Sequence, residues 1–216
     1  MVRLAHGPAR LPLLPQAVQR TYLALTPRTS AHINQKYGAV FTYGGTYPGA
    51  YLLKRALFMP WDLPGLMGAD AAREGIERLD ILGVIGRTMT PDPLQPFARM
   101  VALESCQYLR DQLLRDIDWA SMAHSLEVRV PLVEHHLLRE LAPLLVRARP
   151  DRKRFLVRSP AGGLPAKIFT RGKTGFGVPV RQWLASTMGR GSAREFGWRS
   201  WARHLYDEAF RPTDGI

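Results

Sequence analysis

Apolar residues at helical spacing, separated by prolines and glycines, limit most strongly how this chain can fold. Ile76, Leu79 and Leu82 share one side of a segment that we expect to be helical from 68 to 88. Continuous runs of β-branched and aromatic residues, which favour strands, are scarce. The sequence therefore predicts a mainly α fold.

The same spacing and the prolines predict further helices. We expect a first helix ending before Pro27, a turn-rich stretch at 43–49, and helices at 50–57, 97–115 and 120–125. Another helix is opened by Pro131, and a last short one starts near Pro165. The predicted buried face of the long helix is Phe97, Val101, Tyr108, Leu109 and Leu113, and that of the Pro131 helix is Leu137, Leu141, Leu144 and Leu145.

Composition limits the class of protein but does not identify a binding partner. The 216 residues are 46% hydrophobic, which suits a globular core, and the net charge of +12 attracts anions. Most of the basic excess is Arg, and charge alone gives little support to nucleic-acid binding. The single cysteine, Cys106, the absence of a recognisable signal peptide and the absence of a long apolar run predict a cytoplasmic protein without a membrane span.

Glu127 and Arg129 are the first candidates for a functional site. They lie two residues apart between Leu126, Val128 and Val130, and in an extended segment residues two apart point the same way. A carboxylate and a guanidinium on one buried side must pair with each other or with a substrate. A structural buried ion pair and a substrate site both remain open from this pattern.

Three other candidates have structural and functional interpretations. Asp118 and Ser121 have the spacing of helix-capping residues. Lys173 lies between Gly172 and Gly175, where the backbone can approach a ligand and the ammonium suits phosphate, although a flexible basic loop has the same composition. The six histidines show no metal-ligand spacing, so we predict no metal site built from protein ligands alone.

Two motifs in the expected order resemble the asparagine synthetase C-terminal domain. Tyr108-Leu109-Arg110-Asp111-Gln112-Leu113-Leu114 leads to Asp118, Ser121 and Met122, and then to Ser125-Leu126-Glu127-Val128-Arg129-Val130-Pro131. The loop 171–179, with Lys173 before Gly175-Phe176-Gly177-Val178-Pro179, resembles the lysine-containing loop of that family. The resemblance covers roughly residues 40–185.

The resemblance implies a fold and a reaction. The chain would be the helical C-terminal portion of a nucleotide-binding α/β domain of the adenine nucleotide α-hydrolase-like type. Such enzymes use ATP and Mg2+ to adenylate a carboxylate, typically the side chain of aspartate, and glutamine-derived ammonia then forms the amide. By resemblance Lys173 stabilises phosphate charge, Glu127 positions groups or manages protons near the reacting centre, and Asp118, Ser121 and Arg129 support the site or the substrate.

Departures from the family pattern change the expected function. We recognise neither the Ser-Gly-Gly-x-Asp-Ser nucleotide loop nor an amidotransferase domain with its N-terminal cysteine. The sequence therefore predicts a partial synthetase-like domain at 1–188, lacking the strand region of the ATP loop, and a basic tail rich in Trp and Arg at 189–216. We expect this chain to be inactive alone. One alternative is a split amide ligase completed by a chain that carries the ATP loop and glutaminase, and another is a basic non-catalytic binding module.

Overall fold

The computed structural model describes residues 36–147 and 197–210, together with positions 165, 167, 170–172, 179, 182, 183 and 186. Every regular element in these ranges is a helix, so the predicted mainly α character is confirmed there. The supporting α/β sheet remains a prediction. The expected helix before Pro27 lies outside the described residues, as does Lys173.

The chain divides into two units. One comprises Met1–Arg55 and Leu79–Leu164, and the other comprises Ala56–Arg78 and Pro165–Ile216. The two units are defined by contacts in space. They do not test the predicted boundary at residue 188, which stays a prediction. None of the helices in the described ranges has the length and apolar character needed to cross a bilayer.

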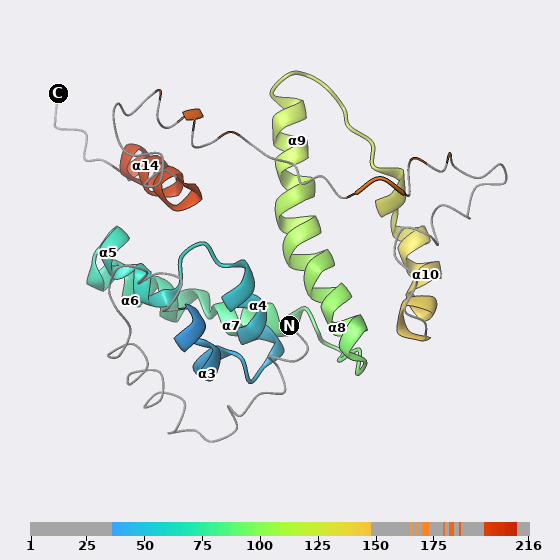
Figure 1. Cartoon of the computed structure of the whole chain (residues 1–216), viewed down its shortest axis with the longest axis horizontal. Coiled ribbons are helices and arrows are strands. Elements are labelled where there is room, and N and C mark those ends of the chain that lie inside the picture. Colours follow the sequence, from blue (N-terminus) through green and yellow to red (C-terminus); the bar gives the residue numbers. More distant parts are fainter. Residues whose placement is uncertain are drawn as a thin grey trace. The chain divides into compact units, whose positions relative to one another are not determined.

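The first unit has a small core where α4 lies beside α7. Its first helices are α3 (Val40–Tyr43), α4 (Tyr47–Arg55), α7 (Ile81–Arg87) and α8 (Pro96–Leu103) (Figure 1). The core side chains are Tyr47, Tyr51, Ile85 and Leu103, with Leu52, Ile81 and Met89 packed against them. The predicted helix at 50–57 is therefore present, but it begins at Tyr47 because Pro48 fits within a first helical turn.

The predicted single helix at 68–88 is wrong. Two helices occupy this stretch, α6 (Ala69–Leu79) and α7, and Asp80 separates them with a left-handed backbone (φ 43°, ψ 56°). The Asp80 carboxylate accepts a hydrogen bond from the Gly83 amide at 3.2 Å, which caps the second helix. Asp tolerates this conformation better than most residues because its short polar side chain bonds locally.

One continuous helical rod runs from Pro96 to Met122 (Figure 1). It consists of α8, a π-helical segment η3 (Glu104–Leu114) and α9 (Arg115–Met122), so the predicted helix at 97–115 is longer and includes part of the piece expected at 120–125. The predicted buried face is wrong at its two ends: Phe97 and Leu113 are exposed, whereas Val101, Tyr108 and Leu109 are half-buried. The fully buried side chains of the rod are Ala98 and Leu103, which the prediction did not include. A π-helical stretch changes the angular step per residue, so a face drawn with the α period does not hold.

Two elements follow the rod in the same unit. Pro131 opens only a 3-10 turn, η4 (Pro131–Val133), and the helix α10 (His135–Arg147) begins after Glu134. This helix lies beside α8 (Figure 1). Leu137 is exposed rather than part of a buried stripe, and Leu141 is half-buried.

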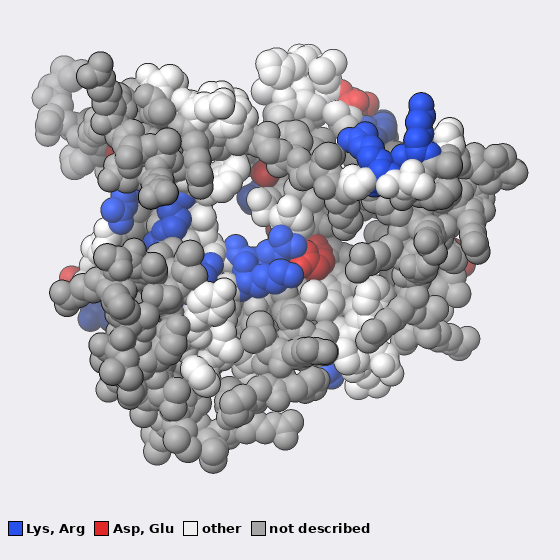
Figure 2. Space-filling view, viewed as in Figure 1, with Lys and Arg blue, Asp and Glu red and all other residues white. Residues whose placement is uncertain are grey.

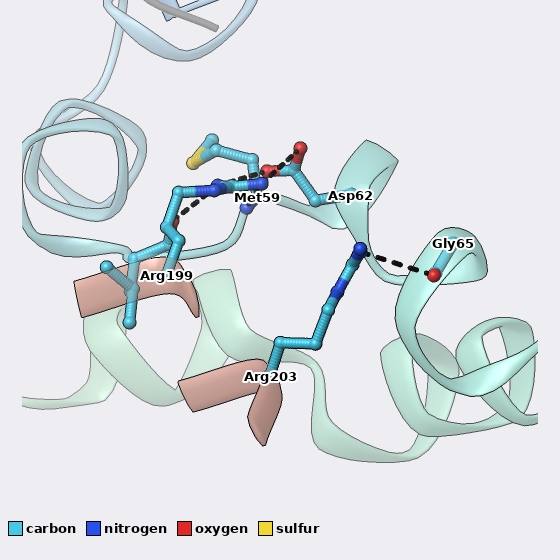
Figure 3. Close-up of polar contacts among 6 residues, drawn as sticks. Met59, Asp62, Gly65, Arg199 and Arg203 are labelled. Carbon is cyan, nitrogen blue, oxygen red and sulfur yellow. Dashed lines mark hydrogen bonds and ion pairs between the residues drawn. The ribbon is translucent and has the colours of Figure 1, made fainter. Parts of the chain in front are cut away.

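The second unit joins residues 56–78 to the C-terminal helix. Its elements are η2 (Pro60–Asp62), α5 (Pro64–Met67), most of α6, and α14 (Trp198–Phe210), a helix that the sequence pattern does not predict. Figure 3 shows Arg199 of α14 reaching the Asp62 carboxylate, with an ion-pair distance of 3.0 Å. Arg199 also donates to the Leu57 carbonyl at 2.7 Å, and its guanidinium lies 4.3 Å from the centre of the Phe58 ring.

Candidate functional site

The first motif segment, beginning at Tyr108, lies inside the π-helix and is held against α4. The Arg55 guanidinium forms an ion pair with Glu104 and lies 4.0 Å from the centre of the Tyr108 ring. Tyr51 is buried next to this pair, and burial, followed by the charge of Glu104, raises the pKa of its hydroxyl. These contacts fix one edge of the motif to the core of the first unit.

Asp118 and Ser121 lie within α9. The predicted capping role is therefore wrong, because the helix is already continuous when it reaches them. The Ser121 hydroxyl donates to the Asp118 carbonyl oxygen at 3.2 Å, a contact between successive turns. The Asp118 carboxylate is exposed. Both side chains thus belong to one rigid element that ends one residue beyond Ser121.

Ser125, which the sequence reasoning did not single out, turns the chain at the end of α9. Its φ is +55°, its amide donates to the Met122 carbonyl at 3.0 Å, and the Leu126 amide donates to the Ser121 carbonyl at 2.9 Å. These two bonds around a left-handed residue form a Schellman motif, in which glycine is the usual residue. The motif directs the next residues away from the helix axis.

Glu127 and Arg129 form the ion pair that the sequence predicts as one alternative. The Arg129 Nη2 to Glu127 Oε1 distance is 2.6 Å. The predicted burial is wrong, because the two side chains are 82% and 70% exposed for Arg129 and Glu127 respectively. Glu127 and Arg129 therefore bind each other in this structure, and both charged groups are accessible to a ligand or to another chain.

Glu134 ends the motif region and caps α10. Its carboxylate accepts hydrogen bonds from the amides of His136 at 2.9 Å and Leu137 at 2.8 Å. These bonds lower the pKa of the Glu134 carboxyl, because they favour its charged form. Glu134 therefore has a structural role here and orients the helix that follows the motif.

The described residues do not by themselves form a binding site for Mg2+. Among them, no three His, Cys, Asp or Glu side chains lie close enough together to hold a metal ion. Four of the predicted site residues lie within twelve positions of one another along α9 and the segment after it: Asp118, Ser121, Glu127 and Arg129. The fifth, Lys173, falls outside the described ranges.

Positive charge does not dominate the main described range. Residues 36–147 contain nearly equal numbers of basic and acidic side chains, so the excess of the whole chain lies in the remaining segments. On the face drawn in Figure 2, a central group of Lys and Arg side chains lies beside acidic ones. Ion pairs such as Arg99 with Asp92 account for part of this balance. This part of the chain therefore offers little support for a basic binding module.

The order of the two sequence motifs is the order expected of a synthetase-type domain, and the family comparison agrees with that class. The sequence model of the Asparagine synthase family matches residues 9–208, and the chain belongs to this family. It is 36% identical over 92 residues to the putative asparagine synthetase [glutamine-hydrolyzing] of Mycobacterium tuberculosis (strain H37Rv), covering 41% of this chain and 14% of the relative.

A second relative gives the same result. Over 105 residues the chain is 29% identical to asparagine synthetase [glutamine-hydrolyzing] 1 of Bacillus subtilis (strain 168), covering 47% of this chain and 15% of the relative. The aligned region thus spans about a seventh of the curated relatives, by the same figures. No solved structure matches the chain.

Proposed function

We propose that this chain contributes to ATP-dependent formation of an amide from a small-molecule carboxylate, typically the side chain of aspartate. In this reaction a carboxylate oxygen attacks the α-phosphorus of ATP and pyrophosphate leaves. The nitrogen of glutamine-derived ammonia then attacks the acyl carbon, and AMP leaves. The observation that carries the proposal is the family match over residues 9–208.

Two residues have proposed roles in the reaction. Glu127, whose exposed carboxylate is held near Arg129, positions the ammonia or accepts its proton as the C–N bond forms. Lys173 supplies a positive charge to phosphate oxygens, an interaction that gains strength as charge builds on the departing pyrophosphate. Asp118, Ser121 and Arg129 support the site or the substrate from α9 and the segment after it.

The chain acts, in this proposal, only together with residues that carry a nucleotide loop and a source of ammonia. The support is that no Ser-Gly-Gly-x-Asp-Ser loop is recognisable among the 216 residues. A partner chain that carries the ATP loop and glutaminase would complete the ligase.

Complementation tests the proposal. The purified chain is mixed with a synthetase fragment that carries the ATP loop, and amide formation from aspartate, ATP, Mg2+ and ammonia is measured. We expect activity in the mixture, its loss in Lys173→Ala, and its retention in Lys54→Ala, a control lysine exposed on α4. Full activity of Lys173→Ala would refute the role of that residue, and an inactive mixture of folded chains would count against completion in trans.

A further inference from the structure

Arg55 is the last residue of α4, and its side chain reaches the rod formed by α8, η3 and α9. The guanidinium pairs with Glu104, the first residue of η3, and lies 4.0 Å from the centre of the Tyr108 ring, four residues further along. The Arg55 and Glu104 side chains are 34% and 29% exposed, so solvent screens this pair less than it screens a fully exposed one. One side chain of α4 thus contacts two positions of η3.

These contacts fall where the rod changes from α-helix to π-helix. The helix α8 ends at Leu103, which is fully buried in the core, and η3 begins at Glu104. A π-helical step is one of the few causes of a sharp bend in a helix, because the ladder of backbone hydrogen bonds changes there. The junction is therefore a place at which the rod can bend, and Arg55 lies against it.

Beyond Tyr108 the charged contacts of the rod are internal. Within the described part of the chain, Arg110 pairs with Asp111 at 2.6 Å, and Arg115 lies 5.7 Å from the centre of the Trp119 ring. Every residue of α9 except Ser121 is exposed. The helix α9 therefore adds little of its own to fixing the direction of the rod.

Asp118 and Ser121 lie on this exposed length. From Tyr108 to Ser121 the rod measures about 20 Å at 1.5 Å per residue, so a tilt of about 5° at the junction moves Ser121 by roughly 2 Å. A displacement of about 1 Å in a catalytic arrangement can lower a rate about 100-fold. A small change in the contacts of Arg55 would thus reach residues that support the site in the proposed reaction.

We propose that Arg55 is a positioning residue, which fixes the direction of the rod through Glu104 and Tyr108 and so places Asp118 and Ser121 for amide formation. Arg55 lies outside both sequence motifs and acts through the helix. The placement for amide formation rests on the proposed function, whereas the fixing of the rod does not.

A distance measurement tests the fixing of the rod without any activity. Spin labels at Arg87→Cys on α7 and Trp119→Cys on α9, in a Cys106→Ser background, report the direction of α9 by pulsed electron paramagnetic resonance. Both labelled positions are exposed, at 69% and 71%. We expect a narrow distance distribution in this labelled parent, and one that broadens or shifts by about 2 Å or more in Arg55→Met. Arg55→Lys, which retains the charge but not the planar group, should lie in between and serves if Arg55→Met fails to fold.

The complemented ligase tests the consequence for the reaction. Arg55→Met should lower kcat/KM for aspartate by about tenfold or more, while the concentration of the nucleotide-loop fragment at half-maximal activity stays the same. Arg78→Met is the control, since this arginine pairs with Glu74 within α6, and it should change neither the distance distribution nor kcat/KM.

The two measurements separate the possible failures. A distance distribution that is unaltered in Arg55→Met would overturn the proposal, as would full kcat/KM in a variant whose rod has moved. An inactive mixture with the parent chain counts against the proposed function instead, and the distance distribution then still decides whether Arg55 fixes the rod.

Discussion

At the residue scale, Asp92 shows how a single carboxylate can bind a loop to a helix. Its carboxylate accepts hydrogen bonds from Arg99 Nε at 2.7 Å, from Arg99 Nη2 at 2.6 Å and from the Leu94 amide at 2.9 Å. The hydrogen bond from Arg99 is the main reason that the pKa of Asp92 falls from 3.8 to about 2. The charged carboxylate therefore favours the folded state.

The pH dependence follows from that direction. A depressed folded pKa gives stability that is present above the unfolded value of 3.8 and is lost as pH falls through about 2. We predict a carboxyl titration midpoint near 2 by NMR. The unfolding free energies of wild type and Asp92→Asn should differ at neutral pH and converge at strongly acidic pH. An ordinary midpoint for Asp92 would contradict the bidentate contact.

Gly49 and Gly75 are two helical glycines with opposite expected responses to alanine. A Cβ at Gly49 would overlap the Tyr43 carbonyl oxygen, whereas a Cβ at Gly75 meets nothing within 4 Å. Gly49→Ala should therefore destabilise the chain by about 1–3 kcal/mol. Gly75→Ala should stabilise it by about 0.5–1 kcal/mol, since alanine favours a helix interior. The free energies of unfolding in urea measure both changes. If the two variants changed them equally, the turn before α4 would not be packed as this structure has it.

At the element scale, the Schellman motif at Ser125 sets the direction of the segment that carries Glu127. A β-branched residue fits a left-handed backbone poorly, and Ser125→Val should cost about 1–2 kcal/mol. Ser125→Gly should retain stability and the end of α9. Hydrogen exchange at the Leu126 amide, which bonds to Ser121, reports the motif directly. Unchanged protection in Ser125→Val would contradict this account of the turn.

Helical periodicity predicts the type of most described elements but not their limits. The break at Asp80 depends on a side-chain bond to Gly83, which a count of apolar positions does not contain. The π-helical step in η3 alters which side chains face the core, as the exposed Leu113 within it shows. Local hydrogen bonding, rather than hydrophobic spacing, decided both differences.

The candidate site was predictable to a similar extent. The pairing of Glu127 with Arg129 follows from their spacing, but their exposure depends on neighbouring chain that the segment itself does not specify. Ser125 was missed because a serine with positive φ has no strong signal in one sequence. The available clue was its position at the end of an expected helix, directly before a stretch in which apolar and charged residues alternate.

At the scale of the whole molecule, Arg199 joins positions far apart in the sequence within the second unit. Figure 3 shows its contact with Asp62, whose side chain is only 10% exposed. Arg199→Ala leaves that carboxylate with fewer donors and should destabilise the unit by about 1–3 kcal/mol. Arg203, which donates to the Gly65 carbonyl at 3.4 Å, is a weaker contact.

Arg203→Ala is therefore the matched control for Arg199. It removes a guanidinium one turn further along α14 and should cost less than Arg199→Ala. Limited proteolysis near Met59 and thermal unfolding measure both effects. If Arg203→Ala were the more damaging variant, the anchoring role of Arg199 would be wrong.

The central claim of the proposed function is that this chain uses ATP only together with a nucleotide loop supplied by another chain. The direct test is ATP–pyrophosphate exchange with aspartate and Mg2+ on the purified 216-residue chain, checked for folding by circular dichroism. We predict no exchange from the folded chain alone and exchange once a fragment with the nucleotide loop is added. Exchange by the chain alone would contradict the claim and would mean that these 216 residues build a nucleotide site by themselves.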